Sequence, residues 1–437
     1  MIKRILKKIP GYEKLVIPLH RVRAFRAASK YDYPASNMKV IGITGTNGKT
    51  TTAFMVHKML TAAGHKTALM TTVAYGVGND LKPQISHMTT VSAKLLNERI
   101  AGFRDAGAEY LVLEITSHAL AQRRVFGIPI DVAVLTNVTH EHLDYHKTFA
   151  NYLNAKRKLF KIANRTHGGQ RVGIINADDP VAKIFAGDIA NPLTYGIDKG
   201  DLRARQVKLE STGIDYYVKV DDVKLHIRSP IPGLFNVYNS LAAVGVGLSY
   251  GLTPEQIEKG IAALTSVEGR MNRVNEGQKF QVVVDFAHTP DSFEKLLSDF
   301  RKSTKGKLIV MFGSAGRRDE KKRAAQGEIA GKYADVVVLT EEDDRDVDGQ
   351  EILSQIAEGA EKSNKKLDEN LFKVLDRTAA IEFALKQAKA ADDVVMLLGK
   401  GHEKTIERAD GEHPWDETEV ARKILRSKIS TSSRKSA

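Results

Sequence analysis

Short apolar runs bounded by turn-forming residues recur along the chain and predict buried strands. The first covers Lys39–Thr44 and is followed by a helical pattern from Thr50 to Ala63 and by a second strand over Thr67–Thr72. Further strands are predicted at Tyr110–Leu113, Val132–Leu135 and Val172–Ile175. Because helical patterns lie between several of these strands, the chain is predicted to form an α/β fold with a doubly wound, mostly parallel sheet.

The pattern of apolar and polar residues changes at two later points in the chain. Residues 202–227 alternate in short segments, which indicates a small antiparallel part. A second strand–helix series follows Gly269-Arg270 and predicts a C-terminal Rossmann-like α/β domain. Its strands are Gln281–Asp285, Leu308–Phe312, Val336–Leu339 and Val394–Leu398. We therefore expect four parts: a helical lead (1–38), a central P-loop-type domain (39–266), a C-terminal domain (267–426) and a disordered basic tail (427–437).

Charge is concentrated at the two ends of the 437-residue chain, whose net charge is +13. Residues 1–30 hold nine Lys/Arg and one Glu, and residues 421–437 hold six Lys/Arg and no acid. A nearly neutral middle argues against nucleic-acid binding. Two helices are expected in the lead, the first ending at Pro10-Gly11 and the second over Leu15–Ala28. They either pack on the body with a solvated basic face or lie on an anionic membrane surface.

The remaining composition is that of an ordinary globular protein. No cysteine is present, which excludes disulfides and fits a reducing cytoplasm. No apolar run is long enough for a membrane span, and the basic start lacks the apolar core of a secretory signal. We therefore expect a cytoplasmic protein, and expect it to be monomeric.

The clearest candidate for chemistry is a glycine-containing turn between the first strand and helix: Gly45, Thr46, Asn47, Gly48, Lys49, Thr50 and Thr51. Backbone N–H groups at such a turn surround phosphate oxygens, Lys49 can reach the transferable phosphate, and the Thr50 hydroxyl can bind Mg²⁺. The standard P-loop spacing GxxxxGK[ST] is not met, because Ile43 occupies the first glycine position. The residues alone leave open a general NTPase or kinase, or a turn without nucleotide.

Three further segments follow in order, Glu114–His118, Thr136–His146 and Tyr152–Lys156. Together with the loop, this order resembles the Mur ligase family of peptidoglycan precursor synthesis, and most closely its branch that adds the third amino acid. The resemblance runs from about Lys39 to Lys423. It implies an ATP-dependent ligase that uses ATP as substrate and two Mg²⁺ ions.

The resemblance assigns roles around the metal ions. Glu114 follows a strand, where a carboxylate can hold Mg²⁺ through oxygen. His142 resembles the family histidine at the second ion, within a cluster that also holds His140, Glu141, Asp144 and His146. Lys156 matches a lysine that the family carbamylates, although the sequence alone would make it a solvated helix lysine. The metal set is Thr50, Glu114, His142 and Lys156, and the catalytic set is Lys49, Lys156, His142 and His288.

Other segments resemble the family's substrate contacts. For ATP, beyond the loop, these are Asn236, Asn239, Arg270 and Asp285, with His288 near phosphate. For the muramoyl-dipeptide acceptor they are Thr89, Thr90, Ser117 and Arg124, although Val91 replaces the family proline. For the incoming amino acid they are Glu342, Asp343, Arg345, Gly399 and Glu403.

Two departures from the family pattern affect the substrates. Only about 38 residues precede the first strand, where the branch carries a larger domain that binds the uridine nucleotide. The lead or a partner could hold the nucleotide instead. Alternatively, the acceptor could be lipid-linked. The diaminopimelate-adding enzymes carry Asp-Asn-Pro-Arg where this chain has Glu342-Asp343-Asp344-Arg345. Arg345 suits the distal carboxylate of meso-diaminopimelate, which we favour slightly, whereas the added acids suit the ammonium of L-lysine.

The predicted reaction adds a diamino acid to UDP-N-acetylmuramoyl-L-alanyl-D-glutamate through an acyl phosphate, giving ADP and phosphate. Only small-molecule substrates are expected as partners, apart from membrane contact through the basic ends. Two other classes stay open. One is a related amide ligase, such as a folylpolyglutamate or cyanophycin type or an enzyme with a lipid-linked acceptor, and the other is a non-catalytic, membrane-associated partner in wall synthesis.

Overall fold

The computed structural model describes residues 12–84, 88–139, 141–210, 212–220 and 222–435. The chain divides into two compact units, and Ser266 begins the continuous part of the second, next to the boundary expected at Val267. The first predicted helix of the lead, which ends at Pro10, lies outside the described residues. Among the described residues, no helix combines the length and apolarity that a bilayer crossing requires.

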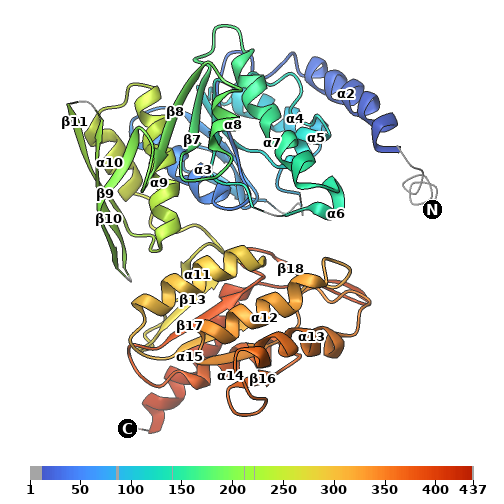
Figure 1. The fold of residues 1–437 in the computed structure, drawn as a ribbon, viewed down its shortest axis with the longest axis vertical. Helices are drawn as coiled ribbons and strands as arrows, with labels where there is room; N and C mark the ends of the chain where they lie inside the picture. Colours follow the sequence, from blue (N-terminus) through green and yellow to red (C-terminus); the bar gives the residue numbers. More distant parts are fainter. Residues whose placement is uncertain (1–11, 85–87, 140, 211, 221, 436–437) are drawn as a thin grey trace. The chain divides into compact units, whose positions relative to one another are not determined.

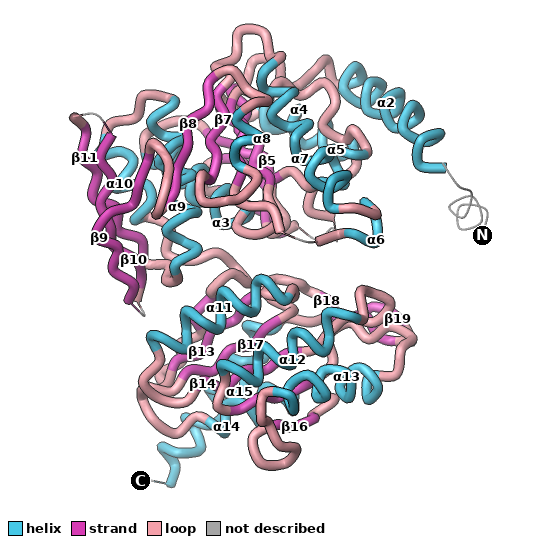
Figure 2. The backbone as a smooth tube through the Cα atoms, viewed as in Figure 1, coloured by secondary structure: helices cyan, strands magenta, loops and turns pink. Residues whose placement is uncertain are grey.

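The first unit is built on a sheet of eleven strands among the described residues, in the order β11-β10-β9-β8-β7-β6-β1-β5-β2-β3-β4. Figures 1 and 2 label the strands at one end of this order, β7, β8, β9, β10 and β11. Its strands are β1 (Lys39–Thr44), β2 (Thr67–Met70), β3 (Ala74–Val77), β4 (Asp80–Pro83), β5 (Tyr110–Glu114), β6 (Val132–Leu135), β7 (Val172–Asn176), β8 (Asn191–Gly196), β9 (Leu202–Glu210), β10 (Gly213–Val220) and β11 (Val223–Ser229). The central strands pair in parallel, whereas β2–β3, β3–β4 and β10–β11 are antiparallel. The predicted mostly parallel sheet with a small antiparallel part is confirmed.

Helices cover this sheet because its central strands are apolar on both faces. They are α2 (Tyr12–Lys30), α3 (Lys49–Ala62), α4 (Ala93–Asp105), α5 (Ser117–Ala121), α6 (Leu143–His146), α7 (Phe149–Asn164), α8 (Ala182–Ala186), α9 (Leu234–Ser249) and α10 (Pro254–Ala262). One core joins α4, α5, α7 and α8 to one face of the sheet. Leu159 of α7 lies so close to Gly42 of β1 that a side chain there would meet it at 2.8 Å. This packing fixes α7 against the strand that precedes the phosphate loop.

The described part of α2 packs on the body of the first unit. Ala24 and Ala28 are buried, and the helix contacts α4. The guanidinium of Arg21 lies 5.6 Å from the ring of Phe126, while Val22 and Phe25 stay exposed. This arrangement agrees with the first of the two alternatives for the lead, a helix packed on the body.

The second unit holds a six-stranded sheet in the order β12-β13-β17-β14-β15-β16 and a separate hairpin, β18–β19. The strands are β12 (Asn272–Arg273), β13 (Gln281–Asp285), β14 (Leu308–Phe312), β15 (Val336–Leu339), β16 (Leu371–Lys373), β17 (Val394–Leu398), β18 (Thr405–Arg408) and β19 (Gly411–Pro414). The helices are α11 (Pro290–Ser303), α12 (Lys321–Tyr333), α13 (Gly349–Lys362), α14 (Arg377–Gln387) and α15 (Glu417–Lys435).

All strands of this sheet except β12 run parallel. The order of the strands in this sheet departs from their order in the chain at β17, which lies between β13 and β14. Ligands of open α/β sheets bind outside the carboxyl ends of the strands at such a crossing. One expectation is corrected here: α15 continues to Lys435, so residues 427–435 of the predicted disordered tail are helical.

Candidate active site

The phosphate loop joins β1 to α3 and is braced by the chain that follows β6. Gly48 caps α3 in the left-handed region, with φ of 83°, and a side chain there would collide with Asn239 Oδ1 at 2.3 Å. The Asn47 backbone N–H donates to Asn137 Oδ1 at 2.9 Å, and Thr136 Oγ1 donates to the Asn47 carbonyl at 2.6 Å. Glycine is therefore required at position 48, and the loop is held from a neighbouring strand.

Glu114 lies at the end of β5, beside the start of α3. Its Oε2 accepts hydrogen bonds from Thr50 Oγ1 at 3.0 Å, and from the backbone N–H and hydroxyl of Thr72 at 3.0 and 3.1 Å. A hydroxyl and a carboxylate oxygen at this separation are the hard oxygen ligands that Mg²⁺ takes. The structure thus brings together two of the four predicted metal ligands at the phosphate loop.

Lys156 extends from α7 underneath the loop and is 1% exposed. Its Nζ donates to the Gly45 carbonyl at 2.5 Å and lies 4.5 Å from the centre of the Tyr152 ring. Burial, followed by the nearby Lys49 ammonium, lowers the pKa of Lys156 well below its usual range. The structure therefore places this lysine at the loop, where the residues alone would have exposed it to solvent.

Tyr152, from the same helix, fixes the loop from below. Its hydroxyl lies 2.9 Å from Thr46 Oγ1, which in turn accepts the Thr139 backbone N–H at 2.9 Å. Lys49 donates to the Thr46 carbonyl at 2.7 Å. The loop thus keeps its shape through hydrogen bonds that join it to the two later segments Thr136–His146 and Tyr152–Lys156.

The described histidines of the predicted cluster, His142 and His146, make edge-on and tilted ring contacts with His118. His142 is the N-cap of α6 with φ of 55°, its ring centre lies 4.7 Å from that of His118, and its Nε2 lies 3.6 Å from Glu141 Oε2. His140 lies outside the described residues. The described part of the chain holds no group of three or more His, Asp or Glu placed to bind a metal ion. The fit to Mg²⁺ rests on the oxygen atoms of Thr50 and Glu114 described above.

Two asparagines of α9 that were predicted to contact ATP lie beside α3. Asn239 Nδ2 donates to Asn236 Oδ1 at 2.8 Å, and Thr52 of α3 donates to Asn239 Oδ1 at 3.3 Å. Both asparagines are buried. The structure brings these predicted ATP contacts directly to the loop.

The predicted acceptor residues gather around the end of β5. Thr90 Oγ1 donates to the Glu114 carbonyl at 3.1 Å, and Arg124 Nη1 donates to the Thr90 carbonyl at 2.5 Å. Ser117 Oγ lies 3.0 Å from His146 Nε2. Burial lowers the pKa of Arg124. Thr89 is half-buried beside this group.

The remaining ATP candidates form a group of their own in the second unit. Asp285 Oδ2 accepts the Met271 N–H at 2.8 Å, and burial raises the Asp285 pKa although Arg270 opposes it. The Arg270 guanidinium lies 4.6 Å from the Phe286 ring centre. His288 Nδ1 lies 2.8 Å from the Phe286 carbonyl.

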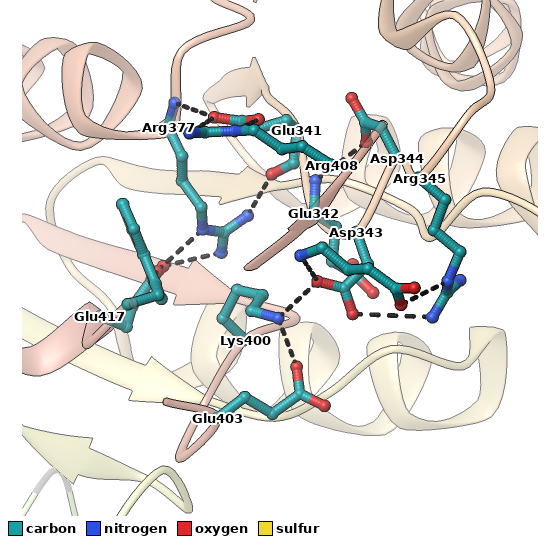
Figure 3. A network of polar contacts seen from close by, with 12 residues as sticks. Glu341, Glu342, Asp343, Asp344, Arg345, Arg377, Lys400, Glu403, Arg408 and Glu417 are labelled. Carbon is teal, nitrogen blue, oxygen red and sulfur yellow. Dashed lines mark hydrogen bonds and ion pairs between the residues drawn. The ribbon is translucent and has the colours of Figure 1, made fainter. Parts of the chain in front are cut away.

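The predicted amino-acid residues meet at the carboxyl ends of β15 and β17 (Figure 3). Lys400 Nζ donates to Asp343 Oδ1 at 2.8 Å and pairs with Glu403 Oε2 at 2.6 Å. Burial opposes the charge of Lys400, but the Glu403 and Asp343 carboxylates raise its pKa above the usual value. Gly399 has φ of 104°, and a side chain there would lie 2.7 Å from Glu342 Oε2.

A buried ion pair supports this group. Arg377 and Glu417 are 0% exposed and joined at 2.7 Å, and Arg377 also donates to the carbonyls of Glu341 and Leu398. Arg408 makes two hydrogen bonds to the Glu341 carboxylate, at 2.8 and 2.7 Å. Arg377 thereby ties the segments after β15 and β17 to α15.

Sequence reasoning missed several of these partners, namely Thr72, Tyr152, Glu341, Arg377, Arg408, Glu407 and Glu417. Thr72 ends the second predicted strand, which was the one available signal that it would face the other strand ends. Glu341 adjoins the predicted Glu342, and Tyr152 begins a segment that carried the resemblance to the family. The other four come from segments distant in sequence, namely Arg377, Glu407, Arg408 and Glu417.

A glycine loop between strand and helix, a carboxylate at the neighbouring strand end and a second α/β unit define a nucleotide-dependent enzyme of the Mur type. Residues 43–247 match the Mur ligase middle domain, and residues 269–401 match the Mur ligase, glutamate ligase domain. The chain belongs to the Mur ligase family, whose members are ATP-dependent amide ligases.

Particular relatives agree with this assignment. The chain is 39% identical to the UDP-N-acetylmuramyl-tripeptide synthetase of Roseiflexus sp. (strain RS-1), covering 96% of this chain and 83% of the relative. It is 38% identical to the UDP-N-acetylmuramoyl-L-alanyl-D-glutamate–2,6-diaminopimelate ligase 1 of Clostridium acetobutylicum, over 97% and 86% of the two chains. Among solved structures, a diaminopimelate ligase of the same name matches with a TM-score of 0.66 and 28% identity, over 94% and 83% of the two chains.

Proposed function

We propose that this protein uses ATP to join a diamino acid to UDP-N-acetylmuramoyl-L-alanyl-D-glutamate. The observation that carries the proposal is the contact of 3.0 Å between Thr50 Oγ1 and Glu114 Oε2, made at a phosphate loop that also holds Lys49 and the buried Lys156. The names of the relatives support the acceptor and the class of amino acid.

The reaction has two steps. A carboxylate oxygen of the acceptor attacks the γ-phosphorus of ATP, the bond to the β,γ-bridging oxygen breaks, and ADP leaves. The amino group of the diamino acid then attacks the acyl carbon, loses a proton, and phosphate leaves as the amide forms. Positioning and charge neutralisation supply most of the catalysis in the first step.

The residues of the phosphate loop bind and orient the nucleotide. The backbone N–H groups at the start of α3 face the phosphates, and Lys49 exchanges its hydrogen bond with the Thr46 carbonyl for the transferred phosphate. Thr50 and Glu114 would hold Mg²⁺, which offsets the charge on the phosphate oxygens when it is bound. Asn236 and Asn239 are proposed to contact the nucleotide within the first unit. The roles of Arg270, Asp285 and His288, which lie in the second unit, stay predictions.

The burial of Lys156 supports carbamylation of its side chain. A lysine reacts with CO₂ only as a neutral amine, giving a carbamate and a proton, and burial together with Lys49 favours that neutral form. A carbamate at Lys156 would supply an anion for a second Mg²⁺ beside His142. We therefore retain both two-ion binding and carbamylation as parts of the proposal.

Residues around the end of β5 are proposed to hold the acceptor. Arg124, with Ser117 and Thr90, carries the cation and hydroxyl groups that suit an anionic peptide. The contact between Thr90 and the Glu114 carbonyl places these groups next to the proposed metal ligand.

The test is release of ADP and phosphate by the purified protein offered ATP, Mg²⁺, the muramoyl-dipeptide and a panel of diamino acids. Lys49→Ala should lower kcat by a factor on the order of 10²–10⁴, because the transferred charge loses its cation. Lys58→Ala, on the same helix with its Nζ bonded to the exposed Asn79, should keep normal turnover. Products of AMP and pyrophosphate, or equal turnover of the two variants, would contradict the proposal.

A further inference from the structure

The amino-acid pocket of the second unit contains more acid than its bases neutralise. Figure 3 labels the acidic and basic residues that follow β15 and β17, together with Arg377 of α14, Arg408 of β18 and Glu417 of α15. Lys400 forms ion pairs with Asp343 and Glu403. Arg377 pairs with Glu417, and Arg408 pairs with Glu341. Glu342 and Asp344 are the labelled acids that none of these pairs includes.

The surroundings of Asp344 favour the protonated form of its carboxyl group. Burial, then the adjacent carboxylates, raises the pKa of Asp344 to about 6, although the Glu342 backbone N–H donates to its Oδ1 at 3.2 Å. Glu342 belongs to none of these ion pairs, although its charge is one of those that raise the pKa of Arg377.

The environment of Glu342 shows where a partner would lie. The residue is 7% exposed, and within the described part of the chain its buried Oε2 has no hydrogen-bond donor. The same oxygen faces Gly399, where a Cβ atom would lie 2.7 Å away. A buried carboxylate oxygen without a donor is unfavourable, so the pocket is completed by an N–H group of a ligand.

The guanidinium that could have held a carboxylate in this pocket is already engaged. Arg345 Nε donates to Glu407 Oε2 at 2.7 Å, and its Nη1 donates to the Gly316 carbonyl at 2.5 Å. Its Nη2 lies 3.9 Å from Asp343 Oδ2. The Arg345 backbone N–H also donates to the Glu407 carbonyl at 3.0 Å, which holds the segment after β15 to β18. Bidentate binding of a ligand carboxylate would have to displace Glu407.

We propose that this pocket takes a diamino acid whose side chain ends in an ammonium group without a second carboxylate, of the lysine or ornithine class. Glu342 is the counter-charge for that ammonium, and the Arg345–Glu407 pair excludes the distal carboxylate of diaminopimelate. This inference rests on the proposed function and names its amino-acid substrate. It reverses the slight preference for diaminopimelate that the retained Arg345 gave, because Arg345 is paired within the protein.

The experiment compares kcat/KM for L-lysine, L-ornithine and meso-diaminopimelate in the complete protein with ATP, Mg²⁺ and the muramoyl-dipeptide. We expect kcat/KM for L-lysine or L-ornithine to exceed that for meso-diaminopimelate by about tenfold or more. The ammonium of lysine or ornithine meets the carboxylate of Glu342, whereas the distal carboxylate of diaminopimelate meets Arg345, which is already paired with Glu407. Release with diaminopimelate alone would overturn the inference and leave the proposed function intact. Release with none of the three would overturn the proposed function, and the inference with it.

Two variants assign the selectivity to residues. Glu342→Gln should raise KM for the preferred diamino acid about tenfold with a smaller change in kcat, because the ammonium loses its counter-charge. Glu369→Gln, at a side chain that is 65% exposed, is the matched control and should leave KM unchanged. Equal KM values for these two variants would contradict the role of Glu342.

Glu407→Gln tests whether the Arg345–Glu407 pair excludes meso-diaminopimelate. This test does not depend on the stability of the Glu342 variant. Removing its charge frees Arg345, so the variant should gain activity with meso-diaminopimelate relative to L-lysine. An unchanged ratio between the two substrates would refute exclusion by the Arg345–Glu407 pair.

Discussion

The phosphate loop offers a sharp test at Gly48, because two separate effects oppose a side chain there. Its φ of 83° lies in the left-handed region, and a Cβ atom would meet Asn239 Oδ1 at 2.3 Å. Gly64, at the other end of α3, has φ of 93° and no heavy atom within 4 Å of the added Cβ. Gly48→Ala and Gly64→Ala therefore share the backbone strain and differ in the collision.

The expected losses follow from these contacts. Left-handed backbone costs an alanine about 1–2 kcal/mol. At Gly48 the side chain of Asn239 must also move away from Asn236 and Thr52, and each lost hydrogen bond is worth about 0.5–1.5 kcal/mol. We therefore expect Gly48→Ala to lower the free energy of unfolding by about 3 kcal/mol and Gly64→Ala by about 1 kcal/mol.

Urea unfolding of the two variants measures this difference, and calorimetric titration with ATP and Mg²⁺ measures its consequence for binding. Gly48→Ala should bind ATP more weakly because the loop it distorts surrounds the phosphates. Gly64→Ala should bind ATP as the unaltered protein does. Equal losses of stability, or normal ATP affinity in Gly48→Ala, would refute the assignment of Gly48 to a loop packed against Asn239.

Two further predictions concern the second unit. Arg377→Met should destabilise the protein by about 3–5 kcal/mol in urea unfolding, because Glu417 is left buried without a cation. Arg426→Met removes a side chain that is 62% exposed in its pair with Glu276 and should change the stability far less; similar losses in the two variants would contradict the burial of the first pair. Because the pKa of Asp344 is raised to about 6 in the folded protein, its carboxylate opposes folding above that pH, and this penalty disappears as the pH falls towards the unfolded pKa of about 4. Asp344→Asn should therefore raise Tm at pH 8 and change it little at pH 4, and an equal change at both would refute the shift.

The sequence predicted the core of the first unit well because buried parallel strands are continuous apolar runs. The bounds of β1 matched the prediction, and α3 differed by one residue at each end. The edge strands β3 and β4 were not predicted, since Ala74–Val77 and Asp80–Pro83 are short and lack apolar alternation. The inner strand β8 (Asn191–Gly196) was also not predicted, whereas the alternation at 202–227 did indicate the antiparallel strands at the other edge. Hydrophobic patterning thus identifies strands with a continuous apolar run or a clear alternation and misses those with neither.

The site residues show a second limit. Lys156 carries no sign of burial in the sequence, since it lies in a charged helix segment, and only the family resemblance placed it at the loop. Arg345 was predicted to bind a ligand carboxylate, because its neighbours in the sequence do not indicate its pairing with Glu407. That residue lies in the β18–β19 hairpin, 62 residues further along the chain. Pairing between distant charges depends on the complete fold, and no local spacing encodes it.

Positional isotope exchange tests the central claim, ATP-dependent ligation through an acyl phosphate, most directly. The protein is incubated with Mg²⁺, muramoyl-dipeptide and ATP carrying ¹⁸O in the β,γ-bridging position, without any amino acid. Reversible transfer of the γ-phosphoryl group to the acceptor lets the β-phosphate of bound ADP rotate before ATP re-forms. The account predicts that ¹⁸O moves into non-bridging β positions only when the acceptor is present. Retention of all label in the bridge with the acceptor present, or equal exchange without it, would contradict the account.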